Sequence, residues 1–152
     1  MWIDLPRLHE PFARYFRKRR FRWFAQAFGL GPKTQVLDLG GYEYYWSYFK
    51  QQPHVTIVNL DRDIPRSTGF RWVIADARRL PFREHSFDIV FANSVVEHLG
   101  DQQSRSQFAR ELTRVGKSYY IQTPNYWFPI EPHLMTPFIH YFPKKLRKRL
   151  LR

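Results

Sequence analysis

The chain has 152 residues, of which 43% are hydrophobic and 18% aromatic, so it can bury the core of one domain and is unlike a disordered chain. It contains no cysteine, which excludes disulfides and thiolate metal sites, and no apolar run approaches the ~20 residues of a membrane span. The formal net charge of +12 favours anionic partners such as nucleic acid, anionic lipid or an acidic substrate.

The absence of a visible signal peptide leads us to expect a cytoplasmic protein. Within the chain, the positive charge is concentrated in two blocks near the ends. The first block comprises Arg14, Arg17, Lys18, Arg19, Arg20 and Arg22, and the second comprises Lys144, Lys145, Arg147, Lys148, Arg149 and Arg152.

Residues 11–28 have the pattern of an amphipathic helix. Pro11 suits a first turn, Gly29 suits the end, and phenylalanines recur at helical spacing in between. This helix either covers the sheet or roofs the site with its arginines solvated, or it contacts a membrane surface or RNA.

The first predicted strand leads into a glycine turn. Residues 36–39 form a short apolar run that contains Asp38, and Gly40 and Gly41 end it. Residues 43–51 lack glycine and proline, which predicts a helix. A strand, a glycine turn and a helix in this order point backbone amides at an anionic or polar ligand.

Two further predicted strands each end at an acid. Residues 55–60 lead to Asp61, which lies 23 residues after Asp38, close to the ~20-residue offset of a ribose-binding carboxylate. Asp61 is therefore either a ribose ligand, a role that Asp63 could share, or a loop acid. Residues 71–75 lead to Asp76, whose carboxylate could accept a hydrogen bond from an adenine amine while the amide of Ala77 donates to the ring.

The fourth predicted strand, residues 87–92, ends at Asn93 and Ser94. In a doubly wound sheet it lies beside the first strand, and ligands bind beyond the carboxyl ends of the strands at that point. His98 follows closely, and it is the candidate general base or substrate-orienting group, because the histidine side chain in general has an unperturbed pKa near neutrality. The alternative is a histidine that only binds loop backbone.

Ser104 and Gln107 have the spacing of a capping box, which predicts a helix that ends at Gly116. Residues 118–122 then form a fifth strand. The aromatic and proline-rich residues 125–133 are either a substrate lid or a packed surface loop.

Four stretches in this order resemble the motifs of class I S-adenosylmethionine-dependent methyltransferases of the type 11 branch. They are residues 36–40, Asp61, residues 75–77 with 80–82, and residues 86–90 with 95–99. The resemblance implies an α/β fold, with a Rossmann-like doubly wound, mostly parallel sheet of about five strands. It also implies S-adenosylmethionine as cofactor, bound by Asp38, Gly40, Gly41, Asp61, Asp76, Ala77 and Asn93. Tyr42 and Tyr44 depart from the family, because they stand where its second and third glycines usually lie.

We therefore expect one methyltransferase-like domain over residues 1–152, with a basic helix (1–33), a cofactor-binding core (34–125), and an aromatic lid and basic tail (126–152). The expected reaction is methyl transfer to a small-molecule or glycan acceptor. The alternatives are a catalytically inactive binding module and a methyltransferase-like protein associated with RNA or anionic lipid.

The family usually adds an antiparallel hairpin after the fifth strand, and residues 126–152 do not have that pattern. Either the chain is shortened, or it is part of a longer reading frame, or a partner completes the sheet. We expect the open edge to self-associate or to be covered by residues 134–151.

Overall fold

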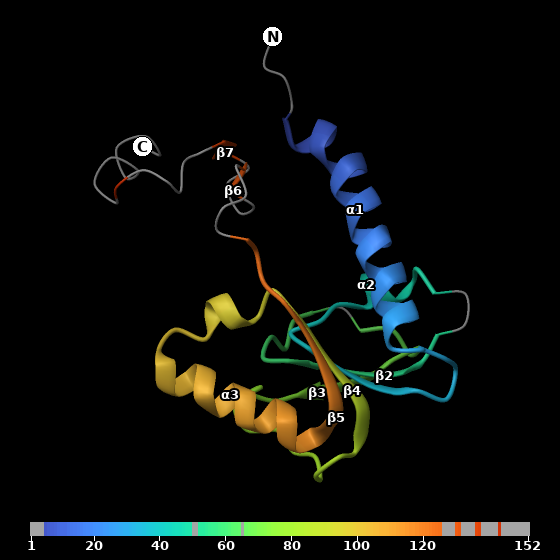
Figure 1. Ribbon diagram of the computed structural model, residues 1–152, viewed down its shortest axis with the longest axis vertical. Coiled ribbons are helices and arrows are strands. Elements are labelled where there is room, and N and C mark those ends of the chain that lie inside the picture. Colours follow the sequence, from blue (N-terminus) through green and yellow to red (C-terminus); the bar gives the residue numbers. More distant parts are fainter. Residues whose placement is uncertain are drawn as a thin grey trace. The chain divides into compact units, whose positions relative to one another are not determined.

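A computed structural model describes residues 5–49, 52–64 and 66–125, together with residues 130–131, 136–137 and 143. The chain divides into two compact units, residues 18–123 and residues 1–17 with 124–152. The unit of residues 18–123 contains the main sheet (Figure 1). The single domain expected over residues 1–152 stays a prediction.

The main sheet confirms the predicted doubly wound α/β fold. In the described part of the chain it has five strands: β1 (Gln35–Leu39), β2 (His54–Asn59), β3 (Arg71–Ile74), β4 (Phe87–Asn93) and β5 (Gly116–Gln122). All neighbours are parallel in the order β3-β2-β1-β4-β5. The strand order reverses between β1 and β4, which is where a ligand is expected in such a sheet.

Alternating residues of the central strands fill two separate cores. Leu37 of β1 and Val90 of β4 pack with Phe108 and Leu112 of α3 (Gln102–Val115) on one face. On the other face, Val36 and its neighbours pack with the aromatic side chains of α1 (Leu5–Ala27) and α2 (Glu43–Trp46). Both faces of β1 and β4 are covered, which explains why residues in the middle of these strands are apolar on both sides. The exceptions are Asp38 in β1 and Asp88 in β4.

Helix α1 begins at Leu5, so the predicted start at Pro11 is wrong. Pro6 already lies in the first turn. The amides of that turn have no partner within the helix, so the missing N–H of proline costs nothing there. The predicted end is confirmed: Gly29 has a φ of +59°, and the Leu30 amide donates to the Ala25 carbonyl.

Helix α2 is much shorter than predicted. It covers only Glu43–Trp46, whereas a helix over residues 43–51 was expected. Aromatic residues are indifferent helix formers, and the Ser47 hydroxyl donates to the Tyr44 carbonyl 2.7 Å away. The rings of this segment pack against the sheet instead of continuing a regular helix.

Helix α3 has a different cap from the one predicted. Asp101, not Ser104, is the N-cap, and its carboxylate accepts from the Ser104 amide at 2.7 Å. Aspartate is as good an N-cap as serine, and a helix that starts after Asp101 is three residues longer than one that starts after Ser104. The Ser104 hydroxyl is thereby left to accept from Arg78 at 3.1 Å. The predicted end at Gly116 is confirmed.

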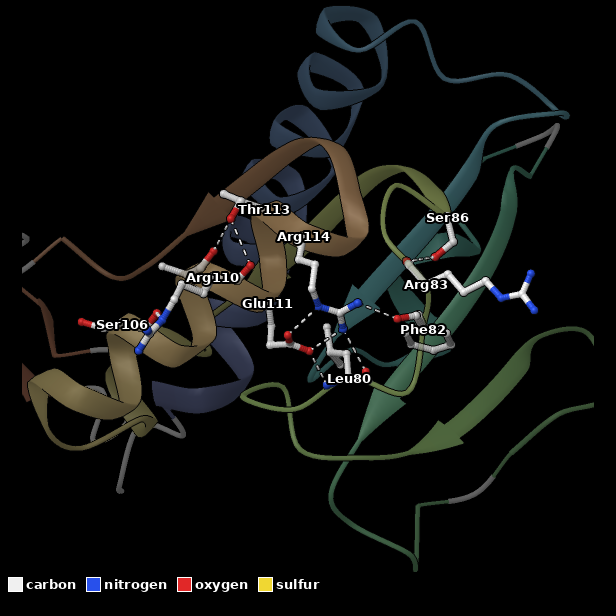
Figure 2. Close-up of polar contacts among 10 residues, drawn as sticks. Leu80, Phe82, Arg83, Ser86, Ser106, Arg110, Glu111, Thr113 and Arg114 are labelled. Atoms are coloured by element: carbon white, nitrogen blue, oxygen red, sulfur yellow. Dashed lines mark hydrogen bonds and ion pairs between the residues drawn. The ribbon is translucent and has the colours of Figure 1, made fainter.

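A polar network holds the β3–β4 connection against α3 (Figure 2). The Arg114 guanidinium donates to both carboxylate oxygens of Glu111, to the Phe82 carbonyl at 2.7 Å and to the Leu80 carbonyl at 3.1 Å. The Glu111 carboxylate also accepts from the Leu80 amide at 2.6 Å. No helix of its own supports this connection, so the side chains of α3 satisfy its backbone.

Two short strands, β6 (Ile130–Glu131) and β7 (Thr136–Pro137), pair antiparallel outside the main sheet. Apart from them, the predicted lid and basic tail of residues 126–152 lie outside the described residues. The same holds for most of the segment 134–151 that was expected to cover the sheet edge.

Candidate functional site

A cavity of about 470 Å³ opens at the carboxyl ends of β1, β2, β3 and β4. This volume is in the range of small-molecule and cofactor sites. Seven of the eight predicted site residues line it: Asp38, Gly40, Gly41, Asp76, Ala77, Asn93 and His98. The motifs that are far apart in sequence thus meet at the point where the strand order reverses.

Gly40 and Gly41 form the floor of this cavity and both need to be glycine. Gly40 has a φ of +67°, and a Cβ atom there would lie 2.9 Å from Val95 Cγ2. A Cβ atom on Gly41 would collide with the Asp38 carboxylate. The Gly40 amide donates to the Val58 carbonyl at 2.7 Å, which ties the turn to β2.

Asp38 lies beneath the turn with 1% of its surface exposed. The Trp46 indole donates to its Oδ2 at 2.7 Å, whereas its buried Oδ1 accepts no hydrogen bond from the described residues. Burial raises the pKa of Asp38 to about 7, although the hydrogen bond from Trp46 opposes this shift. The site therefore contains a carboxyl group with one unsatisfied oxygen, and it titrates near neutrality.

Tyr42 and Tyr44 do not distort the turn. Tyr42 is in the extended region, with φ −135° and ψ 145°, which any residue adopts. Their side chains are 49% and 44% exposed. Tyr42 lines the cavity at its rim, so the chain makes its sharp turn at Gly40 and Gly41 before the tyrosines begin.

Asp61 is the one predicted site residue that does not line this cavity. It lines an adjacent pocket of about 390 Å³, together with Tyr42, Tyr44, Glu43, Asp63, Ile64 and Trp72. Its Oδ1 accepts from the Asp63 amide at 2.9 Å, and its own amide donates to Asn59 Oδ1 at 3.2 Å. Leu60 and Tyr42 line the main cavity, so Asp61 stands just beyond its rim.

Asp76 faces the cavity in a tight pair with Arg78, a residue that sequence reasoning missed. The Arg78 guanidinium donates to both carboxylate oxygens, at distances of 2.6–3.0 Å. These hydrogen bonds are the main cause of the lowered pKa of Asp76. The sequence offered one signal for this pair, namely a basic residue two positions after the acid that ends a strand. At that spacing the basic side chain can turn back and bind the carboxylate.

The loop after β4 brings a second unsatisfied oxygen to the cavity. Asn93 Oδ1 is buried and accepts no hydrogen bond from the described part of the chain. The next residue, Ser94, has a φ of +58°, and non-glycine residues in this conformation are concentrated at functional sites. The short 3₁₀ helix η1 (Val96–His98) then places His98 on the wall.

Outside this site, the described helices include none that is long and apolar enough to cross a bilayer. Likewise, the described histidine, aspartate and glutamate side chains form no group of three or more that could hold a metal ion.

Comparison with known proteins links this geometry to a family. A sequence model described as a methyltransferase domain matches residues 29–119. The glycine/sarcosine/dimethylglycine N-methyltransferase of Actinopolyspora halophila is 33% identical over 102 residues, covering 58% of this chain and 18% of that enzyme. An uncharacterized protein of Mycobacterium tuberculosis is 36% identical over 69 residues, covering 45% of this chain and 23% of that protein.

A solved structure with the same fold is that of a methyltransferase assigned to an antibiotic biosynthesis pathway of Anabaena variabilis. It superposes with a TM-score of 0.62 at 16% identity, covering 88% of this chain and 59% of the other. The chain spans only about a fifth of the length of the curated relatives it matches.

Proposed function

Because the chain belongs to the methyltransferase-domain family of class I S-adenosylmethionine-dependent methyltransferases, we propose that it moves a methyl group from S-adenosylmethionine to a small-molecule or glycan acceptor. The observation that carries this proposal is the cavity at the reversal of strand order, where the glycine turn meets an unsatisfied Asp38 oxygen. A buried carboxylate oxygen without a partner is costly, and a bound ligand would satisfy it.

The residues present fit such a cofactor. Gly40 and Gly41 keep side chains away from the floor. Asp38 beneath it has a pKa of about 7, so it is partly ionised at neutral pH, and a cationic ligand would favour its ionised form. Asp76 and Ala77 supply the acceptor and the amide on the adenine side, and Asp61 supplies the ribose carboxylate at the rim. S-adenosylmethionine, when bound, supplies an electrophilic methyl group on a sulfonium centre.

On the opposite wall, Asn93, Ser94 and His98 are available to orient an acceptor. His98 is the group that would take the proton from an attacking nucleophile, and Asn93 Oδ1 would accept a hydrogen bond from it. Methyl transfer depends largely on the alignment of the nucleophile with the methyl group, so positioning is the main contribution of these residues.

The first test replaces the ribose carboxylate. Charge-assisted hydrogen bonds to ribose hydroxyls are worth roughly 1.5–3 kcal/mol, so Asp61→Ala should weaken S-adenosylmethionine binding by about 10- to 100-fold in calorimetry. Asp63→Ala is the matched control, because Asp63 contacts Asp61 through its backbone amide, which the substitution keeps, and it should change affinity by less than about threefold. Native binding that is indifferent to Asp61 contradicts the assigned site. Titration with a nicotinamide dinucleotide should show no comparable binding.

The second test concerns the tyrosines that replace glycines and separates the enzyme from a binding module that has lost the cofactor. Because Gly40 and Gly41 make the sharp turn, we expect the native chain to bind S-adenosylmethionine and Tyr42→Gly with Tyr44→Gly to change its affinity little. Binding that appears only in the double-glycine chain identifies a catalytically inactive module. Failure of both chains to bind refutes the methyltransferase proposal.

A further inference from the structure

The outward side of the last turns of α1 is strongly basic. Within residues 18–27, the rings of Phe21 and Phe24 are buried against the sheet. The exposed side of the same turns carries what we call the α1 basic face: Lys18, Arg19, Arg20, Arg22 and Trp23. A helix with one apolar face against its own core has its opposite face available to a partner.

Within the part of the chain that the structure describes, the charge on this face is not neutralised by ion pairs with carboxylates. No aspartate or glutamate occurs between residues 11 and 37. Among the described residues, no carboxylate forms an ion pair with Arg19, Arg20 or Arg22, and Lys18 lies over the Tyr48 ring with its Nζ 5.2 Å from the centroid. Four cations within five consecutive residues, with no anion among them, attract an anionic surface.

Trp23 gives this face an apolar anchor. Its side chain is 58% exposed, although one edge of the ring lies near Tyr120, with centroids 6.2 Å apart. An exposed tryptophan beside arginines is unusual for a purely solvated helix, because it leaves a large apolar ring in water. Tryptophan is favoured where an apolar and a polar medium meet.

We propose that the α1 basic face docks on the surface of an anionic phospholipid bilayer. The helix lies in the plane of the interface, with Trp23 at the level of the headgroups. The arginines bind lipid phosphates through their guanidinium groups while their aliphatic stems lie along the surface. This contact is independent of the methyl-transfer proposal, since none of these residues lines the cofactor cavity.

The shape of the face favours a bilayer over RNA. Single-stranded RNA is bound in grooves or on sheets where several aromatic rings stack successive bases. Here the face is one convex helix with a single exposed ring in residues 18–27. A convex cylinder contacts a flat surface along its length, and its flanking cations can spread to either side of the contact line.

Vesicle flotation with the full chain tests this proposal. We expect binding to vesicles of phosphatidylcholine mixed with phosphatidylglycerol, little binding to phosphatidylcholine alone, and a steep loss of binding with added salt. Arg19→Gln with Arg22→Gln should weaken binding by roughly 20-fold, and Trp23→Ser should weaken it several-fold.

The matched control is Arg83→Gln with Arg110→Gln, which removes the same charge from the part of the chain near α3. Figure 2 shows Arg83 extending away from the polar network, and among the described residues the Arg110 side chain makes only one long hydrogen bond, 3.4 Å to the Ser106 carbonyl. This control should change vesicle binding by less than about threefold. Circular dichroism verifies that every variant is folded.

Three outcomes overturn the proposal. The first is equal binding to neutral and anionic vesicles, and the second is an equal loss in the control and the α1 variants. The third is tighter binding to single-stranded oligouridylate than to anionic vesicles, with oligouridylate displacing the chain from the vesicles, which would assign the face to RNA.

Discussion

At the scale of single residues, Asp38 has the greatest influence on the candidate site. It is buried, it lies against Gly41, and one of its buried oxygens has no hydrogen-bond partner among the described residues. Its neighbour Trp46 is fully buried among Phe21, Phe24 and Phe91, so the position of the carboxyl group depends on the aromatic core. Core packing and the candidate site are coupled through this one hydrogen bond.

The raised pKa of Asp38 predicts a pH dependence of stability. Its folded-state pKa of about 7 lies above the ordinary 3.8. Between these two values the folded state keeps a proton that the unfolded chain has lost. The contribution of Asp38 to the free energy of unfolding therefore declines as pH rises from about 4 to about 7. Asp38→Asn should flatten the decline in the free energy of unfolding over that interval, as measured by urea denaturation at a series of pH values.

Asp88→Asn is the control of opposite sign. Asp88 accepts from Lys117 Nζ at 2.8 Å and from the Gln35 amide at 2.9 Å, and these contacts lower its pKa. The contribution of Asp88 to the free energy of unfolding is present above its ordinary pKa and is lost as pH falls through its lowered pKa. Asp88→Asn should therefore flatten the loss of stability at acidic pH and leave the decline between pH 4 and 7 in place. An unchanged slope between pH 4 and 7 in Asp38→Asn would show that Asp38 is ionised in the folded state throughout that interval.

At the scale of elements, helix α3 holds the long β3–β4 connection through Arg114. Surface ion pairs contribute little, but Arg114 also satisfies two carbonyl groups of the connection. These carbonyls are partly buried, so the loss of their donor is costly. The connection leads from Asp76 and Ala77, and the network therefore also stabilises this wall of the cavity.

Replacing Arg114 measures this contribution. Arg114→Ala should lower the free energy of unfolding by about 2 kcal/mol in urea denaturation. Arg110→Ala, on the same helix, should change it by less than about 0.5 kcal/mol, because the Arg110 side chain makes only one long hydrogen bond to the described part of the chain. Equal losses in the two variants would mean that helix propensity, not the network, accounts for the effect.

At the scale of the whole molecule, the strand order leaves β3 and β5 as the edges of the main sheet. Strand β5 also exposes 55% of Tyr119 and 40% of Ile121, which lie on the same face. Exposed edges with apolar side chains tend to pair with other strands. We propose that the chain self-associates through β5.

Sedimentation velocity tests this association. Because the net charge of +12 opposes contact between two copies, added salt should strengthen self-association, whereas it weakens membrane docking. Ile121→Lys should abolish association, and Ile74→Lys on the opposite edge is the control, because Ile74 is also 43% exposed. If the chain stays monomeric at high concentration and high salt, the proposal of self-association through β5 is wrong.

The sequence predicted the order of the strands along the chain, because buried parallel strands are short apolar runs ended by turn residues. The resemblance of its motifs to the methyltransferase family further implied the doubly wound sheet and the site residues, seven of which line the cavity. Prediction failed at the starts of α1 and α3, where several capping choices have similar energies. Pro6 and Asp101 compete there with Pro11 and Ser104.

The sequence by itself determined which residues reach the carboxyl ends of the strands, because local patterns end each strand at a particular residue. Only the tertiary structure decided what those residues contact. It paired Asp38 with Trp46 and Asp76 with Arg78, and it turned Asp61 toward the adjacent pocket. These contacts depend on side-chain packing across separate elements, and no local pattern encodes that packing. The pKa of Asp38 is likewise a property of its burial and not of its place in the sequence.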